Sequence, residues 1–580
     1  MFSEIKYFFS ILNGRTRLRL FLLQILMTFV ALFELTTLAF VALFMRLITD
    51  TEVLSEPGFL YDIYMFVGSN NESEFLMFFG AFGIFTVFLS SLVSFATVWG
   101  LSTFSQALGA RFSSSLYSLY MSNSFTFHLN NPSSKLSSKI AQETNRLTNM
   151  VILPALNLLA KFIQILALIG AIFYMSPSNS LIMLFFLGLM YALIYLTIVK
   201  KVKENGDSLV KLSNIRFKLL NEGFSGIKEI IVFGRRHSFY NSFFNASKSF
   251  GTALGQNLAV GQVPRYLLEF FAYGGIMLIV MLSVQSSNDS GNISELLSYL
   301  AVMGFACIKL LPAIQLCYNS IVTIRANSSS WDVLKSDLKE GMALDSTSLA
   351  KDNQDMKISI SNNFSIKNLS YRYGASTTGS KNVLKNLSIE FPSNKTIGIV
   401  GVSGSGKSTL VDCLLGLLPP SEGSILIDGN NLSSESSQAW MRNIGYVPQS
   451  IFLSNSSVRE NIAFGLPPEL IDDSKVESAA KLANCEEFIQ KFSKGYYEEI
   501  GQDGNKLSGG QRQRLGIARA LYSDPQIVIF DEATSALDGL SEKSVMKSIA
   551  DMNHKKTVII VAHRLATVKH CDIIHVLNDG

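Results

Sequence analysis

The sequence predicts a chain of two parts, an α-helical membrane domain with six transmembrane helices fused to an α/β domain built around a phosphate-binding loop. Composition is the first observation, because only 16% of the 580 residues are charged and 48% are hydrophobic. A soluble protein of this length carries about a quarter charged residues. The deficit lies before residue 330, where six apolar segments occur. In the second part, a glycine-rich loop separates a strand-like run from a helix-like run.

The apolar segments each have room for the roughly 20 residues that cross a bilayer. We place the six spans near 18–48, 75–105, 151–175, 179–199, 266–285 and 293–324. The loops without Lys or Arg are 50–73, 176–179 and 286–292. The other connections carry most of the basic residues, so the positive-inside rule places both chain ends and the α/β domain in the cytoplasm.

Two long basic connections, 106–150 and 200–265, are too polar for the membrane and helical in composition. We interpret them as helix extensions toward the α/β domain, each with a break for a short helix, near 124–132 and 223–234. Solvated loops are the alternative. In the first outer loop, the apolar stretch 57–68 either lies along the membrane surface or packs on the ends of its own spans.

Charge and cysteine content argue against several kinds of protein. The net charge of +4 is too small to indicate nucleic-acid binding. The five cysteines are scattered and form no C-x-x-C pair, so neither a disulfide framework nor a zinc site is expected. The apolar run after Arg19 is too long for a cleavable signal peptide.

The domain boundaries follow from changes in composition. We expect a transmembrane domain over 1–325, a linker rich in Ser, Asp and Lys over 326–356, and the α/β domain over 357–580. Strand-like stretches in that domain are 358–366, 395–400, 425–427, 526–530 and 557–562. Their alternation with helix-like stretches predicts a largely parallel sheet.

The glycine-rich loop has the composition of a phosphate-binding site. Its residues are Gly401, Val402, Ser403, Gly404, Ser405, Gly406, Lys407, Ser408 and Thr409. The glycines let backbone N–H groups point at phosphate oxygens, and the following helix adds its positive N-terminal end. We expect Lys407 to reach the β- and γ-phosphates and Ser408 to hold Mg²⁺. A flexible Gly/Ser turn is the alternative, and the flanking strand and helix argue against it.

A second motif is the apolar strand 527–530, which ends in Asp531 and Glu532. We expect Asp531 to bind Mg²⁺ through water and Glu532 to orient or deprotonate the water that attacks the γ-phosphate. Between this strand and the loop lies the sequence LSGGQ, which opens a helix-like run with Ser508, Gly509, Gly510 and Gln511. This start is either a second anion-binding helix N-terminus or an ordinary capped helix.

The order of these motifs resembles that of the ATP-binding cassette (ABC) transporters, in which LSGGQ is the signature. The resemblance implies roles for four more residues. Tyr373 resembles the aromatic residue that stacks on adenine, and Gln449 resembles the Q-loop residue that contacts Mg²⁺ and the membrane domain. Asp538, in the sequence SALD, is similar to the D-loop residue. His563 resembles the switch histidine on the γ-phosphate.

The resemblance covers nearly the whole chain, since six spans before one cassette resemble an exporter half-transporter. It implies ATP hydrolysis with Mg²⁺ in a dimer, where each ATP lies between the phosphate-binding loop of one subunit and the LSGGQ of the other. Both halves of the site are intact in this chain, so a homodimer is expected. There are two departures. Gln502 stands where many exporters have Glu, and the sequence stops at Gly580, where the family usually continues, so a truncated chain is expected.

Three stretches also resemble the bacterial flippases of lipid-linked oligosaccharides: 125–136, 226–230 and the apolar stretch 57–68. This likeness implies an amphipathic, lipid-linked glycan substrate and a place in the bacterial inner membrane. Export of peptides, toxins or drugs is the alternative. A regulator that does not pump is disfavoured by the intact Glu532 and His563. The sequence identifies neither the sugar, the lipid length nor the direction of movement.

Several charged residues fall inside the predicted spans, where they are costly and mark pathways. Lys161, Arg265 and Lys309 lie in the cytoplasmic halves of their spans, and Glu34 lies on the first span. We hypothesise that the cations line an inward-open cavity and hold an anionic headgroup. The alternative is that Lys161 and Arg265 extend to the inner headgroups of the bilayer.

Overall fold

The structure is a computed structural model. It describes residues 10, 12–49, 54, 59–67, 71–175, 208–209, 211–286, 291–344, 360–373, 382–433, 436–532, 539–552, 555–562 and 565–580. The chain divides into two compact units. The first, here called the membrane unit, contains 1–122 and 132–350, and the second, the cassette unit, contains 123–131 and 351–580.

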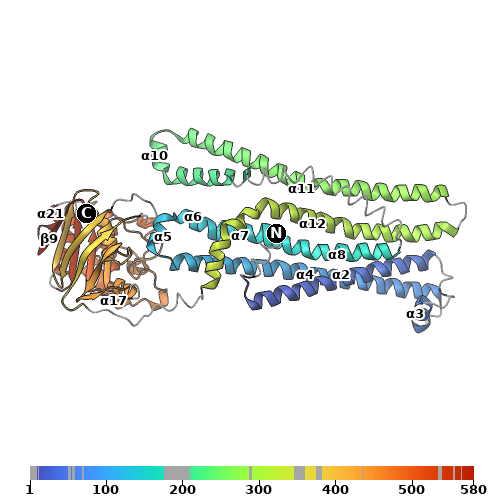
Figure 1. Ribbon diagram of the computed structural model, residues 1–580, viewed down its shortest axis with the longest axis horizontal. Helices are drawn as coiled ribbons and strands as arrows, with labels where there is room; N and C mark the ends of the chain where they lie inside the picture. The colour runs from blue at the N-terminus through green and yellow to red at the C-terminus, as the bar shows by residue number, and fades with distance from the viewer. Residues whose placement is uncertain are drawn as a thin grey trace. The chain divides into compact units, whose positions relative to one another are not determined.

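The described residues of the membrane unit are almost all helical, and short turns separate the helices. Its long helices are α2 (Gly14–Thr49), α4 (Glu72–Ser122), α8 (Leu153–Met175), α11 (Arg236–Ser286) and α12 (Gly291–Ala343). Its short elements are α3 (Phe59–Val67), α6 (Ser133–Ser138), η2 (Lys139–Glu143), α7 (Thr144–Leu147), η3 (Thr148–Ile152) and α10 (Ile227–Val232). In Figure 1 the long helices run lengthwise beside one another.

Among the described residues, four helical segments are long and apolar enough to cross a membrane: 14–48, 72–122, 133–174 and 304–343. They contain or overlap four of the six predicted spans. The predicted span 266–285 lies within α11, and the predicted span 179–199 lies outside the described residues. The helical membrane domain is therefore confirmed.

The helices are longer than a bilayer needs. With 51 residues, α4 measures about 75 Å at 1.5 Å per residue, against about 30 Å of hydrocarbon. Beyond the predicted spans, Tyr120 of α4 and Lys139 of η2 both donate hydrogen bonds to Asp337 of α12, at 2.6 and 2.7 Å. The predicted linker 326–356 begins within α12, because this helix continues through Ala343.

Both predicted breaks contain short helices. The second is α10, and the first is α5 (Phe125–Asn130), which groups with the cassette unit, where Phe125 packs against buried residues of the sheets. The apolar stretch 57–68 is also helical, as α3. Leu60 of α3 is buried among Leu47, Phe75 and Phe79, so one side of α3 packs on the ends of its own spans. Phe66, on the other side, is 92% exposed.

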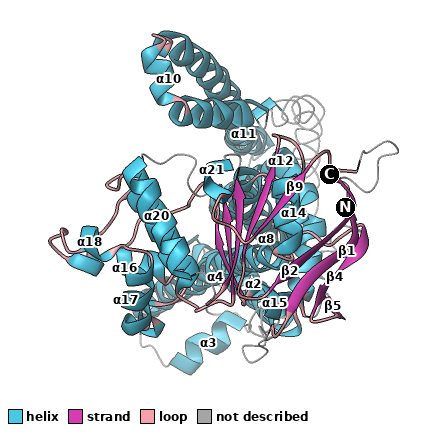
Figure 2. Cartoon of the chain, turned by 90° about the vertical axis from the view of Figure 1, so that its left-hand side faces the viewer, coloured by secondary structure: helices cyan, strands magenta, loops and turns pink. Residues whose placement is uncertain are grey.

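The cassette unit contains two sheets rather than the single, largely parallel sheet that the sequence predicts. One is antiparallel, in the order β2 (Leu384–Pro392), β1 (Asn363–Tyr371), β4 (Glu422–Ile427), β5 (Asn430–Asn431). The other is parallel, in the order β6 (Ile444–Val447), β7 (Ile527–Asp531), β8 (Thr557–Ala562), β3 (Thr396–Gly401), β9 (Ile573–Leu577). Figure 2 shows the antiparallel strands to one side of the parallel ones.

The α-helices of the cassette unit other than α5 are α14 (Lys407–Leu414), α15 (Ser437–Met441), α16 (Val458–Ile462), α17 (Asp473–Leu482), α18 (Glu486–Ile489), α19 (Gly509–Leu521), α20 (Gly539–Met552) and α21 (Leu565–Val568). Short 3₁₀ turns are η4 (Pro468–Leu470), η5 (Gly495–Tyr497) and η6 (Gln502–Gly504).

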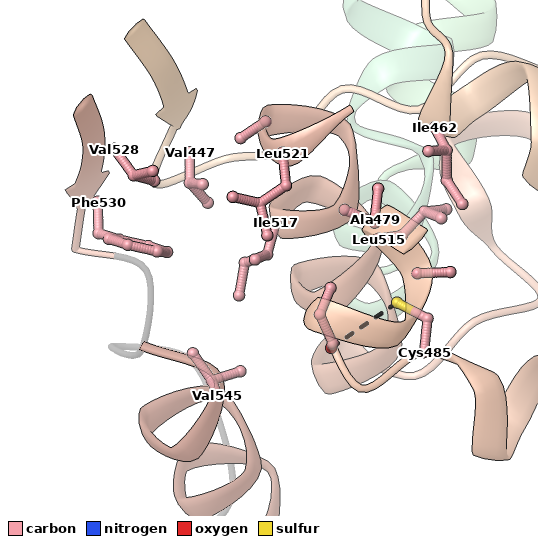
Figure 3. Close-up of a cluster of buried hydrophobic side chains, with 14 of the residues drawn as sticks. Val447, Ile462, Ala479, Cys485, Leu515, Ile517, Leu521, Val528, Phe530 and Val545 are labelled. Carbon is pink, nitrogen blue, oxygen red and sulfur yellow. Dashed lines mark hydrogen bonds between the residues drawn. The ribbon is translucent and has the colours of Figure 1, made fainter. Parts of the chain in front are cut away.

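Two hydrophobic clusters cover the two faces of the parallel sheet, because successive side chains of a strand point to opposite faces. On β7, Ile527 and Ile529 join α14 and the antiparallel sheet in one cluster. Val528 and Phe530 belong to the other cluster, where they face Ile517 of α19 (Figure 3). Because apolar residues cover both faces of this sheet, we expect polar functional residues at the ends of the parallel strands.

Candidate functional site

The phosphate-binding loop joins the end of β3 to the start of α14, as the sequence predicts. Gly406, the residue before α14, has a φ of +97°, which side-chain-bearing residues rarely adopt. A Cβ there would also lie 2.9 Å from a methyl carbon of Leu384. A Cβ at Gly401 would lie 2.4 Å from the carbonyl oxygen of Leu577. The conformation of the loop therefore requires glycine at both of its ends.

Lys407 lies across this loop and is only 5% exposed. Its Nζ donates hydrogen bonds to the carbonyl oxygens of Gly401 and Val402, at 2.9 and 3.0 Å. Burial lowers the pKa of Lys407, while the negative charges of Glu532 and Asp531 act in the opposite direction. The ammonium is thus held inside the loop, near two carboxylates, by acceptors that a phosphate can replace.

The hydroxyl groups of the loop fit a bound phosphate. Ser405 is 2% exposed, and its Oγ has no hydrogen-bond partner among the described residues. Because a buried hydroxyl normally has a partner, this oxygen indicates a place for a polar ligand. Ser408 is exposed, whereas Thr409 is buried and lies 3.2 Å, between hydroxyl oxygens, from Tyr373.

The ring of Tyr373 is 44% exposed and packs edge-on against Tyr371, with 5.1 Å between ring centroids. An exposed aromatic ring that is anchored to the loop through its hydroxyl has a free face for a nucleotide base. This position agrees with the stacking role that the sequence resemblance implies, and the role itself stays a prediction.

The two predicted carboxylates lie at the end of β7. Glu532 has a φ of +50°, a left-handed conformation that is costly for a residue with a side chain, and its N–H donates to the carbonyl of Val561 at 2.9 Å. Gln449 follows β6, which pairs with β7, and its Nε2 donates to Glu532 Oε2 at 2.7 Å. Two residues that are 83 positions apart are therefore in direct contact at one edge of the sheet.

Two residues that sequence reasoning missed surround Asp531. Tyr446 of β6 donates its hydroxyl to Asp531 Oδ2 at 3.4 Å, and burial followed by the charge of Asp531 raises the pKa of Tyr446. Asp412 lies on α14, where burial and then the charge of Asp531 raise its pKa to about 6. A lone carboxylate within the apolar run 410–418 was the available signal for Asp412.

The predicted metal ligands carry oxygen atoms that suit a magnesium ion. Ser408, Gln449 and Asp531 offer a hydroxyl, an amide and a carboxylate oxygen, and Mg²⁺ prefers oxygen ligands together with water and substrate phosphates. Within the described residues, no three His, Cys, Asp or Glu side chains form a metal cluster of their own.

The LSGGQ segment begins α19. The Ser508 Oγ accepts a hydrogen bond from the Gln511 N–H at 3.3 Å, and the Ser508 N–H donates to Gln511 Oε1 at 2.8 Å. This capping box corresponds to the capped-helix alternative, and Gly509 and Gly510 form the first turn. Among the described residues, no hydrogen bond connects this helix start to the phosphate-binding loop of the same chain. Asp538 and His563 lie outside the described residues.

A third residue that the sequence did not reveal is Arg519, near the end of α19. Its guanidinium donates to the carbonyl of Phe452 at 2.6 Å, to the carbonyl of Asn461 at 2.8 Å and to Asn461 Oδ1 at 3.0 Å. It also lies 4.4 Å from the ring centroid of Phe464, and burial lowers its pKa to about 10. Arg519 thereby ties the helix that begins with LSGGQ to the segment that follows Gln449.

In the membrane unit, the cations of the headgroup hypothesis have protein partners. Arg265 forms an ion pair with Glu269 on its own helix at 2.9 Å, and Lys309 lies 3.9 Å from Glu34. The Nζ of Lys161 donates to the side-chain oxygen of Gln164 at 2.7 Å.

Comparisons with known proteins agree with both units. The profile of the ABC transporter transmembrane region matches residues 21–307, and the ABC transporter profile matches residues 384–535. The ATP-dependent lipid A-core flippase of Francisella novicida is 28% identical over 522 residues, which cover 88% of this chain and 84% of that protein.

The leukotoxin export ATP-binding protein LtxB of Aggregatibacter actinomycetemcomitans is 44% identical over 224 residues, or 38% of this chain and 31% of that protein. Among solved structures, a bacterial Atm1-family ABC exporter with ATP bound superposes with a TM-score of 0.71 at 21% identity. This superposition covers 98% of this chain and 95% of that one, and it shows a common fold.

Proposed function

We infer the function from one premise: the chain belongs to the ABC transporter family, with a transmembrane region and an ATP-hydrolysing domain fused in one polypeptide. It is an exporter. We propose that its substrate is a lipid-linked oligosaccharide, that it works as a homodimer in the bacterial inner membrane, and that its cassette and both chain ends are cytoplasmic.

The contact between Gln449 and Glu532 carries the proposal for the ATP site. It brings the carboxylate of Glu532 to the end of β7, beside the neighbouring strand β6, while Lys407 interacts electrostatically with both Asp531 and Glu532. A carboxylate held in this way can accept a proton from the water that attacks the γ-phosphate. Lys407 then turns from the loop carbonyls to the terminal phosphates, and Tyr373 stacks on the base.

Ser408, Gln449 and Asp531 would hold Mg²⁺, which would neutralise charge on the β- and γ-phosphates. The protein residues would set the position of the metal ion, because Tyr446 donates a hydrogen bond to Asp531 and Gln449 donates one to Glu532. The signature residues Ser508, Gly509, Gly510 and Gln511 are proposed to close over the ATP of a second copy, together with Asp538 and His563. The support for this arrangement between two subunits is the resemblance of the LSGGQ segment to the signature of the family.

The proposed substrate has two kinds of support. The first is sequence similarity. A relative that matches most of this chain is named a lipid A-core flippase, and the stretches 125–136 and 226–230 resemble lipid-linked oligosaccharide flippases. The other is the set of basic residues in the spans, which suits an anionic headgroup. A toxin exporter is the second candidate, and the match to LtxB favours it, although that match spans only 38% of this chain.

Reconstitution tests the proposal. The full chain in liposomes is expected to move a fluorescent lipid-linked oligosaccharide when ATP and Mg²⁺ are present, and Glu532→Gln is expected to stop both movement and hydrolysis. Lys309→Ala combined with Arg265→Ala should reduce movement while leaving basal ATP hydrolysis largely intact. Full movement by that double variant would refute the headgroup role of these cations and leave the cassette assignment untouched.

A further inference from the structure

A polar cluster lies among three long helices of the membrane unit. It consists of Glu34 on α2, Lys161 and Gln164 on α8, and Lys309 on α12. Glu34 is 5% exposed and Gln164 is 4% exposed. Apolar residues of the same three helices, Leu38, Leu168 and Leu310, pack together within one buried cluster beside them. Ionised groups in such a place are costly and usually have a function.

The cluster contains more basic than acidic groups. It contains two ammonium groups and one carboxylate, so its formal charge is one positive unit when all three are ionised. Lys161 interacts electrostatically with both Glu34 and Lys309. A surplus charge among buried helices calls for a counter-ion, because the desolvation of an unpaired ion is costly. One anionic charge from a bound molecule would make the cluster neutral.

The contact between Glu34 and Lys309 is loose. The distance of 3.9 Å between Lys309 Nζ and Glu34 Oε1 exceeds that of a hydrogen bond, and Glu34 Oε2 has no hydrogen-bond partner among the described residues. By contrast, Lys161 donates to Gln164 at 2.7 Å, which is an ordinary hydrogen-bond distance. Lys309 keeps 30% of its side chain exposed, so it is the member of the pair that a molecule can reach from outside the helices.

We propose that Glu34 is an internal counter-ion that occupies Lys309 until the phosphate group of an amphipathic substrate replaces it. The inference rests on the proposed function and assigns the anion of the substrate to phosphate. On exchange, Lys309 pairs with the phosphate, and Glu34 stays compensated by the nearby charge of Lys161. No covalent bond changes in this step.

The exchange has a consequence for the helices. Glu34 belongs to α2 and Lys309 to α12, so the ion pair connects these two helices. Since charge interactions are strong in a medium of low dielectric constant, its release weakens one link between α2 and α12. Binding of the anion thereby removes a contact of α12, and this helix continues through Ala343 beyond the predicted span.

The test measures ATP hydrolysis by the full chain in nanodiscs of phosphatidylcholine, with farnesyl pyrophosphate as the probe. Farnesol provides the same chain without charge, and inorganic pyrophosphate provides the charge without the chain. We expect wild type to be stimulated by farnesyl pyrophosphate alone. Glu34→Gln should lower the half-maximal probe concentration about tenfold, because the internal competitor is gone. Lys309→Gln should abolish stimulation, with or without Glu34→Gln.

Asp332 and Lys335 provide matched controls, since they form an ion pair at 2.9 Å on the same helix α12, beyond the predicted span. Asp332→Asn and Lys335→Gln should leave the half-maximal concentration at the wild-type value. Glu34→Asp keeps the charge but shortens the side chain, so it should lower the half-maximal concentration less than Glu34→Gln. It also keeps the test decisive if Glu34→Gln does not fold.

Two failures are distinguishable. If wild type responds equally to farnesol, or to inorganic pyrophosphate alone, the proposed substrate class is wrong, and the anion exchange fails with it. If wild type responds as expected and Lys309→Gln does not, but both Glu34 variants keep the wild-type half-maximal concentration, then Lys309 binds phosphate without an internal counter-ion. That second result overturns the inference and leaves the proposed function standing.

Discussion

The cassette site and the membrane cluster both contain charged residues away from water, and they are assembled in different ways. Lys407, Asp531 and Glu532 lie near one another because the parallel strands β3 and β7, with β8 between them, end at the same edge of a sheet, and each belongs to a local sequence motif. Glu34 and Lys309 come from helices that are far apart in the chain, and no motif surrounds either of them. A site built on strand ends can be located from sequence, whereas one built on helix faces requires the packing.

The two regions also differ in how well their polar atoms are satisfied. In the cassette, Lys407 makes two short hydrogen bonds and Gln449 donates to Glu532 at 2.7 Å. In the membrane cluster, the ion pair spans 3.9 Å, and a carboxylate oxygen of Glu34 lacks a partner among the described residues. The first arrangement is preorganised for chemistry, and the second is suited to exchange.

The largest effect is expected for Lys407→Ala. This change removes the only side-chain cation of the phosphate-binding loop, so nucleotide binding should be abolished. Equilibrium binding of labelled ATP to the purified chain measures it. Lys491→Ala, at an exposed ion pair with Glu487, is the control and should bind as wild type does. Equal binding by Lys407→Ala and wild type would show that the loop does not hold phosphate.

Glu532→Gln should retain ATP and hydrolyse it roughly 10²–10⁴-fold more slowly, because general-base help is lost while Asp531 and Ser408 remain for the metal. Release of phosphate under single-turnover conditions gives the rate. Glu487→Gln, which neutralises a surface carboxylate, should keep the wild-type rate. Turnover above half of the wild-type value in Glu532→Gln would remove Glu532 from its catalytic role.

A smaller effect is expected for Arg519→Lys. Lysine keeps the charge but cannot reach Phe452 and both oxygens of Asn461 at once, so the segment after Gln449 loses its fixed position. We expect kcat to fall about tenfold, because small misplacements of catalytic groups are costly, with the KM for ATP nearly unchanged. Steady-state kinetics separate the two constants.

The control for this prediction is Arg459→Lys. Arg459 also holds backbone carbonyls, those of Pro468 and Ile471, but these lie away from Gln449 in the chain. The variant Arg459→Lys should leave kcat unchanged. If Arg459→Lys and Arg519→Lys reduced kcat equally, Arg519 would have only a general structural role.

The smallest effect concerns Asp337, outside the predicted spans. Burial raises its pKa, but the hydrogen bonds from Lys139 and Tyr120 outweigh burial, so the pKa lies below its ordinary value of 3.8. Ionised Asp337 therefore stabilises the folded state fully at a pH well above 3.8. This stabilisation is lost as the pH falls through the lower pKa that Asp337 has in the folded state. Asp337→Asn should cost about 1–2 kcal/mol at pH 7 and progressively less below pH 3.8.

Thermal unfolding of the detergent-purified chain at pH 7 and pH 3 measures this difference. Asp332→Asn, at the more exposed ion pair on the same helix, should change the melting temperature little at either pH. A difference between Asp337→Asn and wild type that does not shrink on acidification would contradict the assigned cause.

The sequence by itself determined the features that depend on a continuous stretch of chain. Apolar runs identified the spans that α2, α4, α8, α11 and α12 contain, and buried runs identified β3, β7 and β8. The glycine at position 406 was predictable because the turn between a strand and the phosphate-binding helix requires a positive φ. These features follow from backbone conformation and hydrophobic periodicity, which act over neighbouring residues.

Only the tertiary structure decided which residues meet across elements. The strands β2, β6 and β9 were missed because they are short or half-exposed, and with them the antiparallel sheet and the place of Tyr446. The contacts of Arg519 with Phe452 and of Glu34 with Lys309 depend on how the elements pack and on the rotation of each helix about its axis. Hydropathy averages over that rotation, so a sequence pattern places a charge in a span without identifying the side chain that it faces.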